Sequence, residues 1–314
     1  MATLLKGDSQ DSIACGGAAA LVGLLAPSWT DAVHEQAAAA LWNLCVKNSQ
    51  NRDSVRECGG VVALVTLLAP GETGAVLEQA AGALCCLCVD SVQDKGSVRE
   101  CGGVAALVAL LAPGGSAAVR ERAAAALRNL CSDNAQNRDG VRECGGVAAL
   151  VALLAPGGSA AVQEQAAAAL RNLCCDNAQN RDGVRECGGV AALVALLAPG
   201  SSAFVREQAT AALCILCYEN TKNMDCVRWC GGVAALVGLL APGGSAAMHR
   251  SATGVLIHMT SDSGQSREAV RACGGAAALE GVLACASSAA AHEWAAAALR
   301  NLGYVQRDVK QEPH

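Results

Sequence analysis

Aromatic and charged residues are scarce in this chain of 314 residues. One Phe, two Tyr and four Trp make up an aromatic content of 2%, which argues against base-stacking platforms for RNA or single-stranded DNA. Charged residues contribute 16% and the formal net charge is −5, so a broad attraction to nucleic acid or anionic lipid is excluded. Strand-forming residues such as Ile, Tyr, Phe and Trp are also few. Ala and Leu, which favour helices, supply most of the apolar mass and predict an all-α fold.

Signals for export and for membranes are missing as well. Residues 1–10 lack an apolar core long enough for a signal peptide, and Ala2 excludes N-myristoylation. No stretch reaches membrane-spanning length without a Gly, a Pro or a charge, and Lys and Arg occur singly rather than in runs. We therefore expect no membrane insertion, no nucleic-acid partner and a cytoplasmic location, with the nucleus as an open alternative.

A Cys-Gly-Gly triplet recurs with a period of 43 residues. It begins at Cys15, Cys58, Cys101, Cys144, Cys187, Cys230 and Cys273. This period predicts a degraded N-terminal helix or cap at residues 1–14, seven repeats over residues 15–303 and a polar C-terminal tail at residues 304–314. Repeats of this length bury their apolar faces by stacking on one another. Since neither end resembles a strong polar cap, end-on self-association and continuation in a longer protein are both open.

One repeat shows how the sequence is expected to fold. Apolar residues follow helical spacing from Val104 onward, and Pro113 ends that helix. Ser116 is expected to cap a long helix that runs to about Cys131. A polar break follows, and then a short third helix whose apolar face is expected to include Cys144. Three helices in a period near 42 favour the armadillo class over two-helix HEAT repeats.

The residues themselves also resemble the armadillo family. Its pattern is Gly-Gly-apolar-x-x-Leu-Val-x-Leu-Leu, followed by Val-x-Glu-x-Ala-Ala-Trp-Ala-Leu-x-Asn-Leu. Residues 102–111 read Gly-Gly-Val-Ala-Ala-Leu-Val-Ala-Leu-Leu, and residues 119–130 read Val-Arg-Glu-Arg-Ala-Ala-Ala-Ala-Leu-Arg-Asn-Leu. The match recurs in all seven units, over about residues 10–303. The resemblance implies a right-handed α-solenoid, the armadillo-type superhelix, that acts as a non-catalytic scaffold and binds extended peptide segments along a concave groove.

Candidate groove residues recur on the long helices. Glu and Asn are eight residues apart there and share one stripe of the helix. Asn can pair with a peptide backbone, while Glu favours a protein or peptide partner with basic residues. Two alternatives stay open: Asn side chains bonded to the backbone of a neighbouring repeat, and Glu placed at helix starts by the helix dipole. The candidates are Glu35, Glu78, Glu121, Glu164, Glu207 and Glu293, then Asn43, Asn129, Asn172 and Asn301, with His258 in the Asn column and Trp42, Arg128 and Arg171 beside it.

The tryptophan of the family pattern is absent from its own column. Ala or Gly occupies that position in every repeat, so no aromatic sandwich is expected for long aliphatic side chains. Trp42 is instead expected to supply a single aromatic anchor near the N-terminal end. The column comprises Ala39, Gly82, Ala125, Ala168, Ala211, Gly254 and Ala297.

The 18 cysteines raise the question of metal or redox chemistry. Seven belong to the Cys-Gly-Gly triplets and five more share a column at the end of the long helix, and both columns are expected to be buried packing positions. The sequence at His34 starts like the zinc motif H-E-x-x-H but lacks the second His. We therefore predict no catalytic residue, no metal and no cofactor, and free thiols in a reducing compartment. A thiol-based redox or metal sensor and a self-assembling structural rod remain as alternative functions.

Overall fold

The computed structural model describes residues 16–285 and 288–304, which form helices and turns without a β-strand. The first described helix covers residues 16–23, and the predicted cap at residues 1–14 and residues 305–314 of the predicted tail lie outside the described residues. In the described part, no helix combines the length and the apolar character needed to cross a membrane. The helices are α2 (Asp31–Cys45), α3 (Ser49–Glu57), α4 (Gly60–Thr66), α5 (Gly74–Leu87), α6 (Val92–Glu100), α7 (Gly103–Ala109), α8 (Ala117–Cys131), α9 (Ala135–Glu143), α10 (Gly146–Ala152), α11 (Ala160–Cys174), α12 (Ala178–Glu186), α13 (Gly189–Ala195), α14 (Ala203–Cys217), α15 (Thr221–Trp229), α16 (Gly232–Gly238), α17 (Ala246–Asp262), α18 (Gly264–Ala272), α19 (Gly275–Cys285) and α20 (Ala289–Asn301).

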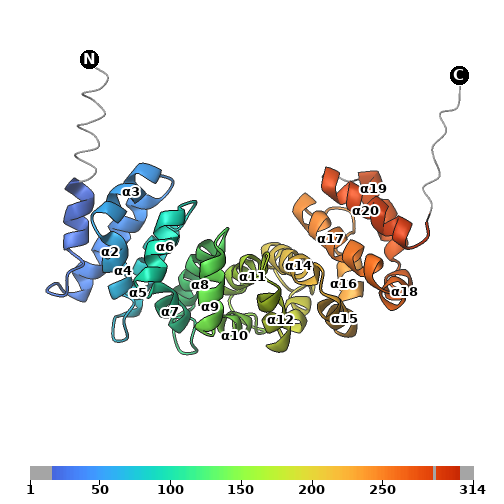
Figure 1. Cartoon of the computed structure of the whole chain (residues 1–314), viewed down its shortest axis with the longest axis horizontal. Helices are drawn as coiled ribbons and strands as arrows, with labels where there is room; N and C mark the ends of the chain where they lie inside the picture. Colours follow the sequence, from blue (N-terminus) through green and yellow to red (C-terminus); the bar gives the residue numbers. More distant parts are fainter. Residues whose placement is uncertain (1–15, 286–287, 305–314) are drawn as a thin grey trace, which may run out of the picture. The chain divides into compact units, whose positions relative to one another are not determined.

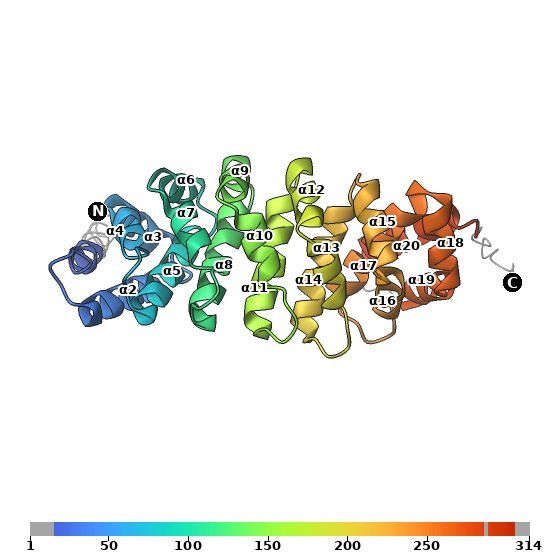
Figure 2. The same cartoon turned by 90° about the horizontal axis from the view of Figure 1, so that it is seen from below.

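The chain divides into two compact units. The first unit comprises Met1–Leu153 and Ala161–Leu173, and the second comprises Leu154–Ala160 and Cys174–His314. In the first unit the long helices α2, α5 and α8 pack side by side, and the short helix α6 packs against α9 (Figures 1 and 2). These helices therefore stack on their counterparts from the preceding repeat.

The second unit repeats the same arrangement. The long helices α14, α17 and α20 form one stack, and α12, α15 and α18 form a second stack of short helices. The helices α13, α16 and α19 form a third stack. Three stacks of equivalent helices make an armadillo-type α-solenoid, which is the predicted fold class.

Local sequence sets the helix boundaries in each repeat. Ser116 caps α8 by accepting a hydrogen bond of 3.1 Å from the backbone N–H of Val119. Asp133, just past the end of α8, has a φ of 51°, which turns the chain. Asn134 then caps α9 through a 2.9 Å hydrogen bond from the N–H of Asn137. The predicted long helix ending at about Cys131 is confirmed.

The helix from Val104 is shorter than its apolar pattern predicts. α7 ends at Ala109, and the N–H of Leu111 bonds the carbonyl of Val108 at 3.1 Å. This tighter hydrogen bond is typical of the last turn of a helix. Leu111 is nevertheless buried, so the apolar periodicity continues past the end of the regular helix.

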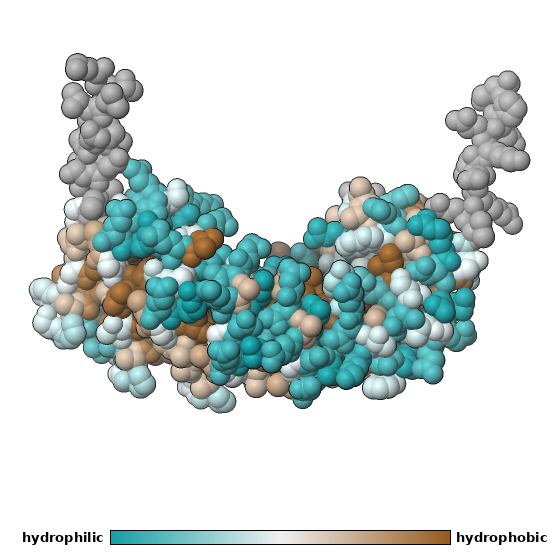
Figure 3. All heavy atoms as spheres, in the orientation of Figure 1, coloured by the Kyte–Doolittle hydropathy of each residue, from teal (hydrophilic) through white to brown (hydrophobic). Residues whose placement is uncertain are grey.

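Leucine and alanine form the core between the stacked helices. Leu107, Leu127 and Leu130 are fully buried, as are Ala123 and Ala126. Small Ala side chains let neighbouring long helices approach closely, while Leu fills the space between the helix layers. On the face of the first unit that Figure 3 shows, hydrophilic and hydrophobic residues are interspersed.

Candidate peptide-binding face

The asparagines of the first unit form a ladder between successive long helices. The side-chain Nδ2 of Asn129 donates to the carbonyl oxygen of Cys85 at 2.9 Å, and Nδ2 of Asn172 donates to that of Arg128 at 2.9 Å. Cys85 and Arg128 lie in the last turns of α5 and α8, where backbone carbonyls lack a helical partner. Each Asn therefore satisfies the end of the preceding long helix, the second of the two roles that the sequence left open.

An arginine next to each asparagine donates a hydrogen bond to its amide oxygen. Nε of Arg128 donates to Oδ1 of Asn129 at 3.2 Å, and Nε of Arg171 donates to Oδ1 of Asn172 at 3.2 Å. Arg128 also reaches the next long helix, where its Nη1 donates to Oε1 of Gln165 at 2.8 Å. The half-buried Asn and Arg side chains are thus held in fixed orientations at the surface of the long helices.

Asn301 makes a different contact because α17 is longer than the other long helices. Its Nδ2 donates to Oγ of Ser261 at 2.9 Å and lies 3.4 Å from Oγ1 of Thr260. Both hydroxyls bond the carbonyl of Ile257, which occupies the position of Arg128 in this repeat. Two hydroxyl groups therefore replace the direct bond to the carbonyl. Asn43, by contrast, is exposed at the end of α2.

Trp42 spans three long helices of the first unit. A Cβ added to Gly82 of α5 would lie 2.9 Å from two carbons of the Trp42 ring, so the ring rests directly on that glycine. On α8, the guanidinium carbon of Arg122 lies 4.6 Å from the ring centroid, in cation–π contact. At Gly82, where the family pattern has a tryptophan, the ring of Trp42 from the preceding repeat therefore packs against the helix.

A matching arrangement in the second unit uses Gly254 of α17. A Cβ at this glycine would lie 3.0 Å from Cζ3 of Trp294 and 2.6 Å from Sγ of Cys214. Trp294 belongs to the following long helix, α20. The ring on Gly254 therefore comes from the next repeat, whereas the ring on Gly82 comes from the preceding one. Sequence spacing alone did not identify either pair, because Trp and Gly occupy different positions in the repeat.

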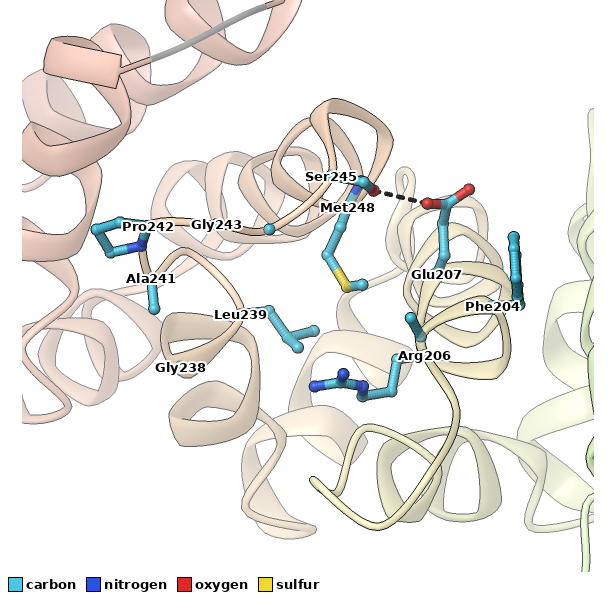
Figure 4. Close-up of a pocket in the computed structure, with 12 residues that line it drawn as sticks. Phe204, Arg206, Glu207, Gly238, Leu239, Ala241, Pro242, Gly243, Ser245 and Met248 are labelled. Atoms are coloured by element: carbon cyan, nitrogen blue, oxygen red, sulfur yellow. Dashed lines mark hydrogen bonds between the residues drawn. The ribbon is translucent and has the colours of Figure 1, made fainter.

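The glutamates lie just after the first turns of the long helices, and their surroundings differ. Glu35, Glu78, Glu121 and Glu164 are half-buried, and Glu293 is exposed. Oε1 of Glu121 lies 3.5 Å from Nη1 of Arg122, a weak ion pair. Oε2 of Glu207 accepts a 2.6 Å hydrogen bond from Oγ of Ser245, the capping residue of α17 (Figure 4).

Glu207 also borders a pocket of about 370 Å³ in the second unit. The turn before α17 forms one wall, and Phe204 and Arg206 of α14 form the other (Figure 4). The first unit has a pocket of about 340 Å³ at equivalent positions, lined by Leu77, Leu110 and residues of the turn before α8. The pocket is therefore a recurring feature of the repeat rather than a single specialised site.

Sequence and structure comparisons identify the family. A sequence model of the armadillo/beta-catenin-like repeat matches residues 8–46, 48–89, 91–132 and 134–175, which together make up just over half of the chain. The chain belongs to the armadillo repeat family. The division of the whole chain into seven repeats stays a prediction, because the matches end at residue 175. Among curated proteins, none shows significant sequence similarity to the chain.

Several solved structures that are similar to this armadillo chain are engineered proteins. One from the Northeast Structural Genomics Consortium has 28% sequence identity and a TM-score of 0.82, and the alignment covers 91% of this chain and 68% of that protein. A designed armadillo repeat protein has 24% identity and a TM-score of 0.71, covering 77% of this chain and 99% of that one. Another, solved in complex with the peptide (KR)4, has 23% identity and a TM-score of 0.69 over 77% and 99% of the two chains.

His258 occupies the Asn column of the armadillo repeat in α17. The Tyr218 ring meets it edge-on, with the ring centroids 5.6 Å apart, and the guanidinium carbon of Arg181 lies 6.0 Å from the Tyr218 centroid. Burial lowers the pKa of His258 and outweighs the opposing effect of Glu219. We interpret His258 as a neutral aromatic side chain at neutral pH.

The lowered pKa of His258 predicts a loss of stability on acidification. An unfolded His titrates near pH 6.5, so just below that pH the unfolded chain binds the proton more readily than the folded chain does. The contribution of His258 to stability is thus complete above about pH 6.5 and is lost as the pH falls through that value toward the folded pKa. We expect the urea midpoint to fall more steeply between about pH 7.5 and about pH 5.5 for the wild type than for His258→Gln. Equal slopes for the two proteins would contradict this assignment.

The two cysteine columns of the armadillo repeat differ in exposure. Cys45, Cys88, Cys131, Cys174 and Cys217 at the ends of the long helices are fully buried, as predicted, and burial raises the pKa of the Cys45 and Cys131 thiols to about 12. The predicted burial of the Cys-Gly-Gly cysteines is wrong. Cys144, Cys187 and Cys230 are exposed, and Cys58, Cys101 and Cys273 are half-buried, while Cys15 lies outside the described residues.

The Cys-Gly-Gly cysteines are accessible because of the backbone after them. From Cys58 onward, each follows the last residue of a short helix, and the next residue is a glycine in the left-handed region, such as Gly145 with a φ of 76°. This turn directs the second glycine, Gly146, into the core and leaves Cys144 outside. Val141 is therefore buried on the apolar face of α9, whereas Cys144, three residues later, does not share that buried face.

Proposed function

We propose that this armadillo chain is a non-catalytic scaffold that binds an extended peptide segment of a partner protein along the face of its long helices. The observation that carries the proposal is the repetition of Glu121 and Asn129 on α8 as Glu164 and Asn172 on α11. The Asn–Arg ladder holds the Asn side chains in the same orientation in both repeats. A repeated, fixed pattern of polar groups suits the repeating backbone of an extended peptide.

Charge defines the partner in this proposal. The half-buried carboxylates of Glu121 and Glu164 favour a peptide with Lys or Arg. The designed armadillo protein that was solved with (KR)4 supports this preference, since it has the same fold and a basic peptide ligand. Trp42 and Arg122 add an aromatic and guanidinium surface at the N-terminal side of the same face. We further propose a reducing compartment such as the cytoplasm, because the exposed cysteines Cys144, Cys187 and Cys230 form no disulfide bond.

The asparagine ladder provides the direct test. Replacing Asn129 and Asn172 with Ala removes the bonds to the preceding helices and any bond to a peptide backbone. We expect each change to lower the free energy of unfolding by about 1 kcal/mol and to weaken binding of the peptide (KR)4 by about 1 kcal/mol. Urea unfolding measures the first effect and fluorescence anisotropy with a labelled peptide measures the second, at a temperature where circular dichroism shows full helicity.

The matched control changes the outer surface. Gln136 and Gln179 are exposed at equivalent positions of α9 and α12, so Gln136→Ala and Gln179→Ala remove two amides away from the long helices. These variants should bind (KR)4 like the wild type. If the Asn variants bind normally while the Gln variants do not, peptide binding occurs on the opposite face.

A further inference from the structure

A histidine and two carboxylates meet where the first long helix begins. Asp31 and His34 lie on the first turn of α2, three residues apart and so on one side of the helix. Glu72 comes from the turn between α4 and α5, in the following repeat. One ligand atom from each of the three residues lies within 4.8 Å of the other two. The cluster thus joins segments that are about one repeat apart in the sequence.

The hydrogen bonding of His34 leaves one ring nitrogen ready to bind a cation. The side chain is 5% exposed, and its Nε2 lies 3.0 Å from the carbonyl oxygen of Ala26. A carbonyl only accepts hydrogen bonds, so Nε2 carries a proton, and in the neutral ring Nδ1 then carries a lone pair. Nδ1 is buried and has no hydrogen-bond partner in the described part of the chain. Metal-bound histidines commonly have this arrangement, with the other ring N–H donated to a backbone carbonyl.

Glu72 provides a second buried acceptor without a donor. Its Oε2 is buried and also lacks a hydrogen-bond partner among the described residues. The helix dipole accounts for an acidic residue such as Asp31 in a first turn, but it does not satisfy the lone pairs of His34 and Glu72. Buried acceptors without a donor are unfavourable. A cation between them satisfies both at once.

His249 is the equivalent of His34 in a repeat that lacks the two carboxylates, and its contacts provide a comparison. It occupies the position of His34 five periods later, and its Nε2 lies 3.2 Å from the carbonyl of Ala241, also eight residues earlier. The sequence has Ala246 at the position of Asp31 and Ser287 at the position of Glu72. The bond to the carbonyl is therefore a property of the repeat, whereas the two carboxylates are particular to the site at His34.

We propose that Asp31, His34 and Glu72 bind one zinc ion. One imidazole nitrogen and two carboxylate oxygens are suitable zinc ligands and leave a fourth position for water. In tetrahedral geometry with bonds of about 2.1 Å, ligand atoms lie roughly 3.4 Å apart, so the cluster needs only a small contraction. The exposed side chain of Asp31 is free to make that movement. The ion links α2 to the turn before α5 and stabilises the N-terminal end of the solenoid.

Cobalt binding to the full chain tests this proposal, because Co²⁺ reports its ligands by absorption. With the thiols kept reduced and metals first removed by a chelator, we expect one equivalent of Co²⁺ to bind with the visible d–d bands of a nitrogen and oxygen site. No thiolate-to-cobalt charge-transfer band should accompany them, and Zn²⁺ should displace the Co²⁺. The double variant Asp31→Asn/Glu72→Gln, which keeps the size of both side chains, should bind Co²⁺ at least 10-fold more weakly.

His249→Gln is the matched control, since it changes the equivalent histidine away from the carboxylates. Zn²⁺ should raise the midpoint of thermal unfolding of the wild type and of His249→Gln, but not that of the double variant. The proposal is overturned if the double variant binds Co²⁺ as tightly as the wild type. It is equally overturned if all bound Co²⁺ shows the thiolate band, or if the wild type binds none.

Discussion

Replacing Gly146 with Ala is expected to lower the free energy of unfolding by roughly 3 kcal/mol. A Cβ at this position would lie 2.5 Å from Cγ1 of Val141, 2.7 Å from the Val141 carbonyl oxygen and 3.1 Å from Cγ2 of Val108. The carbonyl belongs to the backbone of α9 and Val108 to the preceding repeat, so relief requires movement of whole helices. Overpacking of this kind strains a close-packed core. Urea unfolding followed by circular dichroism measures the loss.

The neighbouring glycine provides the control for this prediction. Gly145 has a φ of 76°, but nothing lies within 4 Å of the position of its Cβ. Gly145→Ala therefore creates no steric clash. It only places an alanine in the unfavourable left-handed conformation, which lowers the free energy of unfolding by about 1 kcal/mol. The two substitutions are chemically identical and adjacent in sequence. If Gly145→Ala proves as damaging as Gly146→Ala, the close approach of the repeats is not what requires the second glycine.

Reversing the charge of Glu121 and Glu164 together is expected to weaken binding of the peptide (KR)4 roughly 100-fold. The double change to Lys removes two attractive carboxylates and places two like charges against the peptide. Each residue then contributes about 1.4 kcal/mol to the loss of affinity, since a tenfold change corresponds to that free energy. The effect should shrink at high salt, because ions screen exposed charges. Fluorescence anisotropy at two salt concentrations measures both quantities.

The matched control makes the same Glu-to-Lys substitutions on two short helices. Glu100 and Glu143 are exposed at the ends of α6 and α9, and changing both to Lys alters the net charge equally. This control should reduce the affinity for (KR)4 by much less than the long-helix variant. Equal losses in the two variants would mean that net charge, rather than a defined face, governs binding.

The outcome for the asparagines shows the limit of a repeat pattern. The spacing of Glu121 and Asn129 predicted one shared stripe of the long helix, but two different partners for Asn129 were compatible with that stripe. The structure shows the amide bonded to the Cys85 carbonyl, 44 residues earlier. That carbonyl lacks a helical partner because α5 ends there. The bond therefore depends on how the end of α5 lines up with Asn129 on α8. Whether the same side chains also hold a peptide stays a prediction.

The sequence by itself determined the elements of this protein. Apolar spacing, proline and glycine breaks and polar caps are local, and they predicted the long helix to Cys131 and the cap at Ser116. Local patterns also placed the buried cysteine column, because its members lie on the apolar face of a helix. The Cys-Gly-Gly cysteines from Cys58 onward did not follow such a pattern, since a left-handed glycine reverses the chain directly after each of these six.

Only the tertiary structure decided which residues from different repeats meet. Trp42, Gly82 and Arg122 come together on three helices, and His34 meets Glu72 across one repeat. The positions involved differ within the repeat, so a period of 43 residues does not predict their contact. Their distances depend on the spacing and rotation between stacked helices, which the summed packing of many Ala and Leu side chains sets. A single sequence shows which residues each helix carries to the interface, and the packing of the helices decides which of them touch.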